Sequence, residues 1–169
     1  NSCDEFRRKD NMGLTELLVK INKSTGEIVV RDNGGIPIVK HKEAGIYVPE
    51  FIFGRLRTSS NYDDSEDRNV IGTNGVGSSL ANIFSTKFEV RSADGKHEFY
   101  RSWSNNMRTL NDDLSVLKCS KTTHFTETVM TLDLPRFNVT EISDDFISII
   151  RNNTNMFTII KYYNISWLP

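Results

Sequence analysis

The stretch VIGTNGVGSSLANIFSTKF, residues Val70 to Phe88, places Gly72, Gly75 and Gly77 within six residues and then changes to a helical pattern. Glycine is used where the backbone needs a positive φ or where a ligand lies against the peptide plane. The first N–H groups of a helix have no partner within the helix, and the helix dipole favours an anion at that end. Together these features predict a cradle for phosphate groups at the start of the helix.

The spacing of the glycines separates this cradle from two common nucleotide-binding loops. Its order is G-x-x-G-x-G, the reverse of the dinucleotide fingerprint G-x-G-x-x-G, and it lacks the Gly-Lys-Ser/Thr of a P-loop. Neither of those folds explains the stretch. A glycine loop that only caps a helix remains the alternative when the stretch is taken alone.

The composition is that of an ordinary soluble protein of one domain. The chain has 169 residues, of which 37% are hydrophobic and 25% charged, and its net charge is -1. This balance argues against a broad nucleic-acid groove, because phosphate backbones are held by clustered Lys and Arg. The apolar runs fall short of the roughly 18 residues of a membrane span, which argues against a membrane partner. Two cysteines, Cys3 and Cys119, are too few for a disulfide framework or a zinc site, so we expect an intracellular protein.

Apolar periodicity predicts helices interleaved with antiparallel strands. Two β-branched runs, 17–21 and 26–32, flank a polar turn and predict a hairpin. Further strands are expected over 86–92, 96–104, 113–119, 128–134 and 158–167, and helices over 1–9 (the end of one), 47–57, from Gly77 onward, and 144–157 with Ser143 or Asp144 as the cap. Residues 58–69 read as a loop. This order indicates an α+β two-layer sandwich, with helices packed on one mixed, mainly antiparallel sheet.

Asp32 stands at the end of a strand-like run and is followed by Asn33, Gly34 and Gly35. A carboxylate in this place accepts a hydrogen bond from an exocyclic amine, and the glycines let a flat base approach the backbone. The same residues also suit an ordinary type I or type II turn after a strand. Both interpretations stay open on these residues alone.

Taken jointly, three motifs carry a family resemblance. An Asn at the end of a helix (Asn1), the turn DNGGIP (32–37) and the cradle GTNGVG (72–77) resemble the signature motifs of the ATPase superfamily that includes gyrase, MutL, histidine kinases and a heat-shock chaperone of the same fold. The segments NSCDE (1–5), FIFGRLRTSSNYDD (51–64) and NGVGSSLANIFSTKF (74–88) are similar to the ATPase domain of type IIA DNA topoisomerases, nearest to the phage large subunit and the eukaryotic enzyme. The resemblance spans essentially the whole chain. It implies the Bergerat ATP-binding fold of that superfamily.

The resemblance implies ATP and Mg²⁺ as cofactors and assigns a role to each matching residue. Asn1 matches the asparagine that binds Mg²⁺ across the three phosphates, which agrees with the few protein ligands that Mg²⁺ takes. The other implied ATP contacts are Asp32 at the adenine amine with Thr128 supporting it through water, Ile36 and Pro37 along the base, Ser59, Ser60 and Asn61 at the ribose and phosphates, and Asn74, Gly75, Val76, Gly77 and Ser78 at the triphosphate.

Several departures from the family pattern carry their own expectations. The glutamate that activates the attacking water lies upstream of Asn1 in the family, and general-base assistance is commonly worth about 10²–10⁴-fold. We therefore expect no catalytic residue here, and ATP binding with weak hydrolysis. The family usually has one more residue between Gly34 and Gly35, so the turn under the base is expected to be tighter. Glu127 replaces a small residue beside Thr128, and we expect its side chain to crowd the adenine edge.

These expectations define one domain and its function. Residues 1–169 are expected to be one ATP-binding domain fragment, truncated at both ends, with an ATP lid over about 40–74 and without the transducer, TOPRIM and DNA-cleavage domains. Its function would be the N-gate of an ATP-dependent type II topoisomerase, which acts on DNA through the full-length enzyme as a homodimer or a phage-type multi-subunit assembly. Its location would be a bacterial or phage-infected cytoplasm, or a eukaryotic nucleus. The alternatives are a non-catalytic regulatory or dimerisation module with a decayed pocket, and a histidine-kinase-type catalytic domain.

Overall fold

The computed structural model describes residues 15–56, 76–158 and 164–168, and side chains up to residue 152. The described chain contains one mixed sheet of eight strands in the order β5-β4-β3-β7-β2-β1-β8, with β6 also paired to β4. The strands are β1 (Glu16–Asn22), β2 (Glu27–Asp32), β3 (Ser85–Asp94), β4 (His97–Ser104), β5 (Thr109–Leu110), β6 (Ser115–Lys118), β7 (His124–Leu132) and β8 (Asn164–Leu168). The helices are α2 (Val48–Gly54), α3 (Gly77–Ile83), the 3₁₀ helix η1 (Leu134–Phe137) and α4 (Asp144–Thr158).

All strand pairs are antiparallel except β1 with β8, which is parallel. The expected hairpin is confirmed, because β1 and β2 pair from Leu17 opposite Asp32 to Asn22 opposite Glu27. Gly26 closes its turn with a φ of +71° and donates its N–H to the carbonyl of Asn22 at 3.0 Å. A side chain in that conformation would be strained, which is why the turn ends in glycine.

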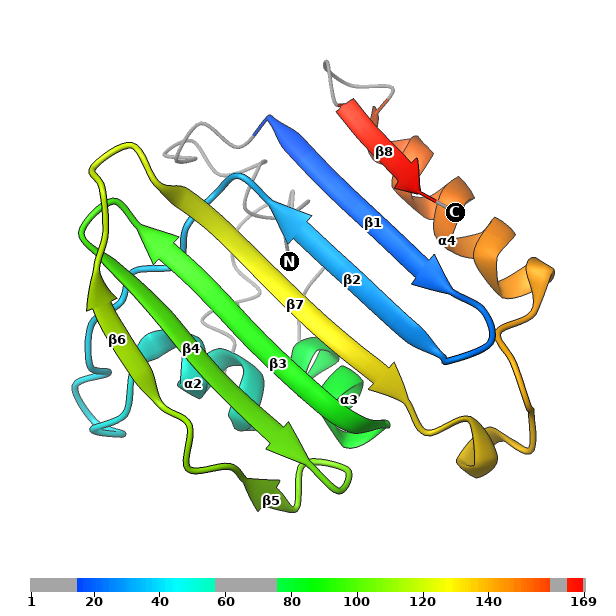
Figure 1. The fold of residues 1–169 in the computed structure, drawn as a ribbon, viewed down its shortest axis with the longest axis horizontal. Helices are drawn as coiled ribbons and strands as arrows, with labels where there is room; N and C mark the ends of the chain where they lie inside the picture. Colours follow the sequence, from blue (N-terminus) through cyan, green and yellow to red (C-terminus); the bar gives the residue numbers. More distant parts are fainter. Residues whose placement is uncertain (1–14, 57–75, 159–163, 169) are drawn as a thin grey trace, which may run out of the picture.

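The helices cover one face of the sheet, as Figure 1 shows for α2 and α3 behind β3 and β4. The strand register explains which side chains point to the helices. Phe88, Met130, Ile28 and Ile21 lie opposite one another on four neighbouring strands and therefore point to the same side. Phe88 belongs to the cluster under α2, whereas Ile28 and Ile21 belong to the cluster under α4. One layer of helices therefore packs on one face, and the expected α+β architecture is confirmed.

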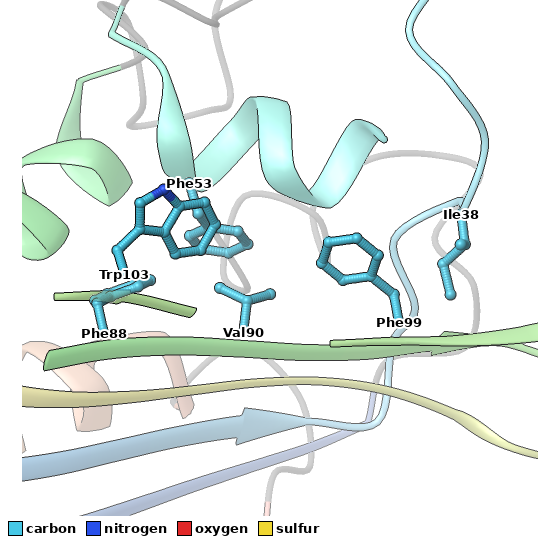
Figure 2. Close-up of a cluster of buried hydrophobic side chains, with 6 residues drawn as sticks. All are labelled: Ile38, Phe53, Phe88, Val90, Phe99 and Trp103. Carbon is cyan, nitrogen blue, oxygen red and sulfur yellow. The ribbon is translucent and has the colours of Figure 1, made fainter. Parts of the chain in front are cut away.

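The larger core cluster lies between α2 and the strands β3 and β4. Figure 2 shows Phe53 of α2 facing Phe88, Val90 and Trp103, which rise from the sheet. Phe88 and Trp103 meet edge to face, with ring centroids 6.2 Å apart. Ile38 joins the same cluster from the loop after β2, next to Phe99, and both side chains are buried. This cluster consists of Ile38, Phe53, Phe88, Val90, Phe99 and Trp103.

The second cluster packs α4 against the other half of the sheet. Ile147 and Ile150 of α4 contact the buried Ile28, Leu134 and Ile142. Ser143 caps the helix, because its Oγ accepts the N–H of Phe146 at 3.2 Å. The expected helix is confirmed, and of the two caps considered, Ser143 and Asp144, it is Ser143 that binds the helix N-terminus.

Most strand boundaries differ by a few residues from the sequence-based expectation, and one strand was missed. β7 begins at His124 rather than at residue 128, because β3 pairs with it along the whole extension and β2 pairs with it from Thr126 onward. β5 was not expected, since it has only two residues at the sheet edge. Thr158, the expected first residue of the last strand, lies in α4, and the strand covers Asn164–Leu168. Pairing with neighbours and packing override local propensity at such places.

The opposite face of the sheet carries a layer of charged and aromatic side chains. Arg31 pairs with Glu127 at 3.0 Å and stacks over the ring of Phe125 at 4.0 Å. Tyr100 donates its hydroxyl to Glu89 at 2.7 Å. Burial, the hydrogen bond to Glu89 and the negative charge of Glu89 raise the pKa of Tyr100. Among the described helices, none is long and apolar enough to span a membrane.

Candidate functional site

Asp32 and Thr128 are brought together on the helix-bearing face of the sheet. Asp32 is the last residue of β2 and lies opposite Thr126 of β7, so Thr128 is its diagonal neighbour on the same face. Both are nearly buried, with 7% and 8% of their surface exposed. The Oδ1 atom of Asp32 accepts the N–H of Gly34 at 3.1 Å. A buried carboxylate beside a buried hydroxyl is suited to bind a group that offers an N–H.

The turn after Asp32, residues 33–38, crosses β7 and reaches the end of β3. β2 and β3 run in the same direction on either side of β7, so their carboxyl ends meet at the same edge of the sheet. The N–H of Ile36 donates to the Oγ of Ser92 at 3.1 Å, and the N–H of Ile38 donates to the Oδ2 of Asp94 at 2.9 Å. The turn is therefore attached to β3 by two side chains.

Gly35 lies where the turn comes closest to the main chain of β3. A Cβ at Gly35 would lie 2.3 Å from the main-chain oxygen of Ala93, where no side-chain carbon fits. Glycine therefore lets the turn lie directly against the main chain of β3. That the turn is tighter than in the family stays a prediction.

Asp94 keeps its charge at this edge. Partial burial pushes the pKa of its carboxyl up, but hydrogen bonds from the main-chain N–H groups of His97, Ile38 and Lys96, with the nearby His97 ring, outweigh burial and lower the pKa below 3.8. The N–H groups of Lys96 and His97 lie 3.0 and 2.8 Å from Oδ1. One carboxylate therefore joins the turn after β2 to the turn after β3.

The expectation for Glu127 is wrong. Its side chain points to the face opposite Asp32 and Thr128 and forms an ion pair with Arg31 at 3.0 Å. Successive residues of a strand point to opposite faces, so a residue next to Thr128 cannot share its side of the sheet. The helix-bearing face above Thr128 is not crowded by Glu127.

Val76, Gly77 and Ser78 form the start of α3 on the same face of the sheet. Val76 occupies the N-cap position, and its carbonyl accepts the N–H of Leu80 at 2.8 Å. Apart from its chain neighbours and the backbone of α3 itself, no atom of the described residues lies within 4 Å of the place where a Cβ of Gly77 would be. The hydroxyl of Ser78 points toward α2 and donates a hydrogen bond to the carbonyl of Ile52 at 3.0 Å.

Of the other residues expected at the base, Ile36 is half-buried and packs against the larger core cluster, and Pro37 is exposed. The remaining expected contacts lie outside the described residues. These are Asn1, Ser59, Ser60, Asn61, Asn74 and Gly75. The described residues contain no group of three or more His, Cys, Asp or Glu side chains that would hold a metal ion.

Sequence reasoning missed Ser92, Asp94 and Thr126. The hydroxyls of Ser92 and Thr126 lie 3.4 Å apart on the helix-bearing face, and Ser92 is fully buried. A signal for them existed in β3, where the buried alternation Phe88, Val90 changes to the polar Ser92 and Asp94. Polar residues on the buried side of a strand indicate a place where they have specific partners.

Comparisons with known proteins agree in one direction. DNA topoisomerase 2 of Arabidopsis thaliana is 37% identical over 152 residues, which cover 89% of this chain and 10% of that protein. A DNA topoisomerase 2 of Caenorhabditis elegans is 43% identical over 148 residues, 86% of this chain and 10% of that protein. No protein-family model matches the chain.

Solved structures agree with these relatives. The ATPase region of Saccharomyces cerevisiae topoisomerase II superimposes with a TM-score of 0.86 at 31% identity, covering 98% of this chain and 44% of that one. The ATPase and transducer domains of topoisomerase II from Balamuthia mandrillaris superimpose with a TM-score of 0.86 at 30% identity, covering 99% and 44%. This chain spans about a tenth of the length of the curated relatives that it matches.

Proposed function

The chain belongs to the ATPase region of the type II DNA topoisomerases, and from this premise we propose that residues 1–169 are one domain that binds ATP. A histidine-kinase-type domain, considered as an alternative, is excluded by that membership. The observation that carries the proposal is the buried pair of Asp32 and Thr128, which lie diagonally on neighbouring strands beside the turn 33–38.

In this proposal Asp32 recognises the adenine. Its carboxylate accepts a hydrogen bond from the exocyclic amine of the base, and the hydroxyl of Thr128 supports the same edge. Ile36 and Pro37 follow in the turn and line the base. A carboxylate only accepts hydrogen bonds, so it favours adenine, which offers an amine at this edge, over guanine, which offers a carbonyl oxygen.

The triphosphate lies at the glycine cradle in this proposal. The open space where a Cβ of Gly77 would lie, at the start of α3, supports it, because the first N–H groups of a helix have no partner within the helix. Asn74, Gly75, Val76 and Ser78 extend this cradle through their N–H groups, and Ser59, Ser60 and Asn61 contact the ribose and phosphates. Asn1 would hold Mg²⁺ beside the phosphates, where the ion would neutralise their charge. A lid over about 40–74 stays a prediction; α2, within that range, is packed in the core.

At the level of the parent enzyme, we propose an intracellular homodimer that couples ATP binding to DNA strand passage. The relatives named above are topoisomerases, which supports the proposal. The phage-type multi-subunit assembly stays a prediction, and the subunit composition of the parent enzyme tests it.

Calorimetric titration with a non-hydrolysable ATP analogue, with and without Mg²⁺, tests the proposal. Asp32→Ala is expected to weaken binding roughly five- to a hundredfold, because one hydrogen bond to a charged group is worth about 1–3 kcal/mol. Glu127→Gln is the matched control, since Glu127 lies in the same strand as Thr128 but on the opposite face. It is expected to bind like the unmodified chain.

Two outcomes contradict the proposal. If the folded chain does not bind the analogue at millimolar concentration, the pocket has decayed and the chain is a non-catalytic regulatory or dimerisation module. If Asp32→Ala and Glu127→Gln bind equally well, the nucleotide is bound elsewhere on the molecule.

A further inference from the structure

The end of β3 contacts and supports the turn that follows Asp32. Three consecutive residues of β3 contact this turn: Ser92 accepts the N–H of Ile36, Ala93 lies against Gly35, and Asp94 accepts the N–H of Ile38. These partners lie 56 residues apart in the chain for both hydrogen bonds. The turn therefore takes its position from β3 as well as from β2.

Each contact restricts the turn in a different way. The Oγ of Ser92 also donates to the carbonyl of Phe125 at 3.2 Å, so the hydroxyl is held in place by β7. Asp94 binds the N–H groups of Lys96 and His97 through Oδ1, which leaves Oδ2 directed at Ile38. The side chain of Ile38 is inserted beside Phe99 in the core, as Figure 2 shows.

The turn 33–38, which these contacts hold, contains residues that the proposed function places at the adenine base. Ile36 and Pro37 lie between the two anchored N–H groups, and Asp32 is bonded to Gly34 at the other end of the turn. A shift of Ile38 away from Asp94 would therefore move the surface that faces the base. Small shifts of positioned groups matter, since a displacement of about 1 Å caused by a distant change lowers the rate of an enzyme reaction by up to about a hundredfold.

We propose that Asp94 and Ser92 are positioning residues for adenine recognition, which hold the turn 33–38 so that Asp32 and Ile36 meet the base together. Neither side chain contacts the nucleotide. The inference rests on the proposed function, because it assigns the means by which that pocket is kept in shape.

The test measures where on the nucleotide affinity is lost. Dissociation constants are measured for the non-hydrolysable ATP analogue, the matching GTP analogue and inorganic triphosphate, at a temperature where every variant is shown to be folded. Asp94→Ala is expected to bind the ATP analogue about tenfold more weakly, because the turn loses its anchor at Ile38 and no longer presents Asp32 and Ile36 to the base together. Binding of inorganic triphosphate is expected to be unchanged, so the preference for ATP over GTP falls.

Three further variants separate positioning from general destabilisation. Asp94→Asn keeps one oxygen acceptor and is expected to lose less affinity than Asp94→Ala. Ser92→Ala removes the anchor of Ile36 and is expected to reproduce the base-specific loss if Asp94→Ala does not fold. Asp113→Asn is the control, because Asp113 accepts the main-chain N–H of Ser102 at 3.1 Å on the opposite face of the sheet. It is expected to leave all three affinities unchanged.

The outcomes distinguish the inference from the proposed function. If the unmodified chain binds no ATP analogue, the proposed function fails and the inference fails with it. If the unmodified chain binds and Asp32→Ala weakens binding, but Asp94→Ala and Ser92→Ala bind like the control, only the inference is overturned. Equal losses for ATP analogue and inorganic triphosphate also overturn it, because they indicate a change of the whole domain.

Discussion

The carboxylate of Asp94 joins two turns, and this role depends on its charge. The main-chain N–H groups of Ile38, Lys96 and His97 all point at it within 2.8 to 3.0 Å. Burial disfavours the charged form, but the three donors and the His97 ring stabilise it more, so the pKa in the folded chain lies below 3.8. Protonation would remove an acceptor from three N–H groups at once.

The pH dependence of stability follows from the lowered pKa of Asp94. A pKa that is lower in the folded chain contributes stability above the unfolded pKa of 3.8, and this contribution is lost as the pH falls through the folded pKa. Thermal midpoints measured between about pH 6 and pH 3 are therefore expected to fall more steeply for the unmodified chain than for Asp94→Asn. Parallel curves for the two proteins would contradict this assignment.

At the scale of elements, α2 forms an ion pair with the sheet on one side and hydrogen bonds with α3 on the other. Its last carbonyls, which have no partner within the helix, accept hydrogen bonds from side chains of α3. The donors and acceptors are Ser78 to Ile52, Ser79 to Arg55 and Asn82 to Phe53. On the sheet side, Glu50 of α2 faces Arg101 of β4 at 3.6 Å, and both side chains are largely buried. Polar contacts thus decide how these two short helices pack on the sheet.

Removal of one partner of the Glu50–Arg101 pair tests this tether. Glu50→Ala is expected to lower the free energy of unfolding by about 3–5 kcal/mol, because it leaves a buried, uncompensated guanidinium. Urea denaturation measures the change. The double variant Glu50→Met with Arg101→Met is expected to recover most of the loss, since a buried ion pair is replaced by apolar groups at little cost. A loss below about 1 kcal/mol for Glu50→Ala would mean that solvent compensates Arg101.

At the scale of the whole molecule, the sheet is most enclosed at β3 and β7. These strands have neighbours on both sides along their length, and the helix layer covers one of their faces. β5 has two exposed residues at one edge, and β8 is the edge on the other side. The site lies at the ends of β2, β3 and β7, which each have a neighbouring strand on both sides, so we expect it to be built on a part of the sheet that opens rarely.

Native-state hydrogen exchange tests this ranking. The amides of β3 and β7 are expected to exchange at least about tenfold more slowly than those of β5 and β6, because opening an edge strand breaks fewer contacts than global unfolding. The same experiment reports on the turn 33–38, whose anchored amides of Ile36 and Ile38 are expected to be protected. Equal protection of β5 and β7 would show that the described sheet opens only as one unit.

Local patterns in the chain are sufficient to specify much of this protein. The alternation in β1 and β2, the polar turn ending in Gly26 and the Ser143 cap predict their elements correctly, since each depends on residues close in sequence. The motifs around Asp32 and the glycine cradle also identify the family. Strand periodicity places Glu127 on the face away from Thr128, so the error about its side chain could have been avoided from the sequence.

The partners of the turn 33–38 are decided only by the tertiary structure. Ser92 and Asp94 contact Ile36 and Ile38 because β3 and β2 run in the same direction on either side of β7. No local sequence pattern contains that strand order. The same holds for the two-residue strand β5 and for the hydrogen bonds from α3 to α2. Local propensity acts over a few residues, whereas these contacts exist only once distant segments are packed in one register.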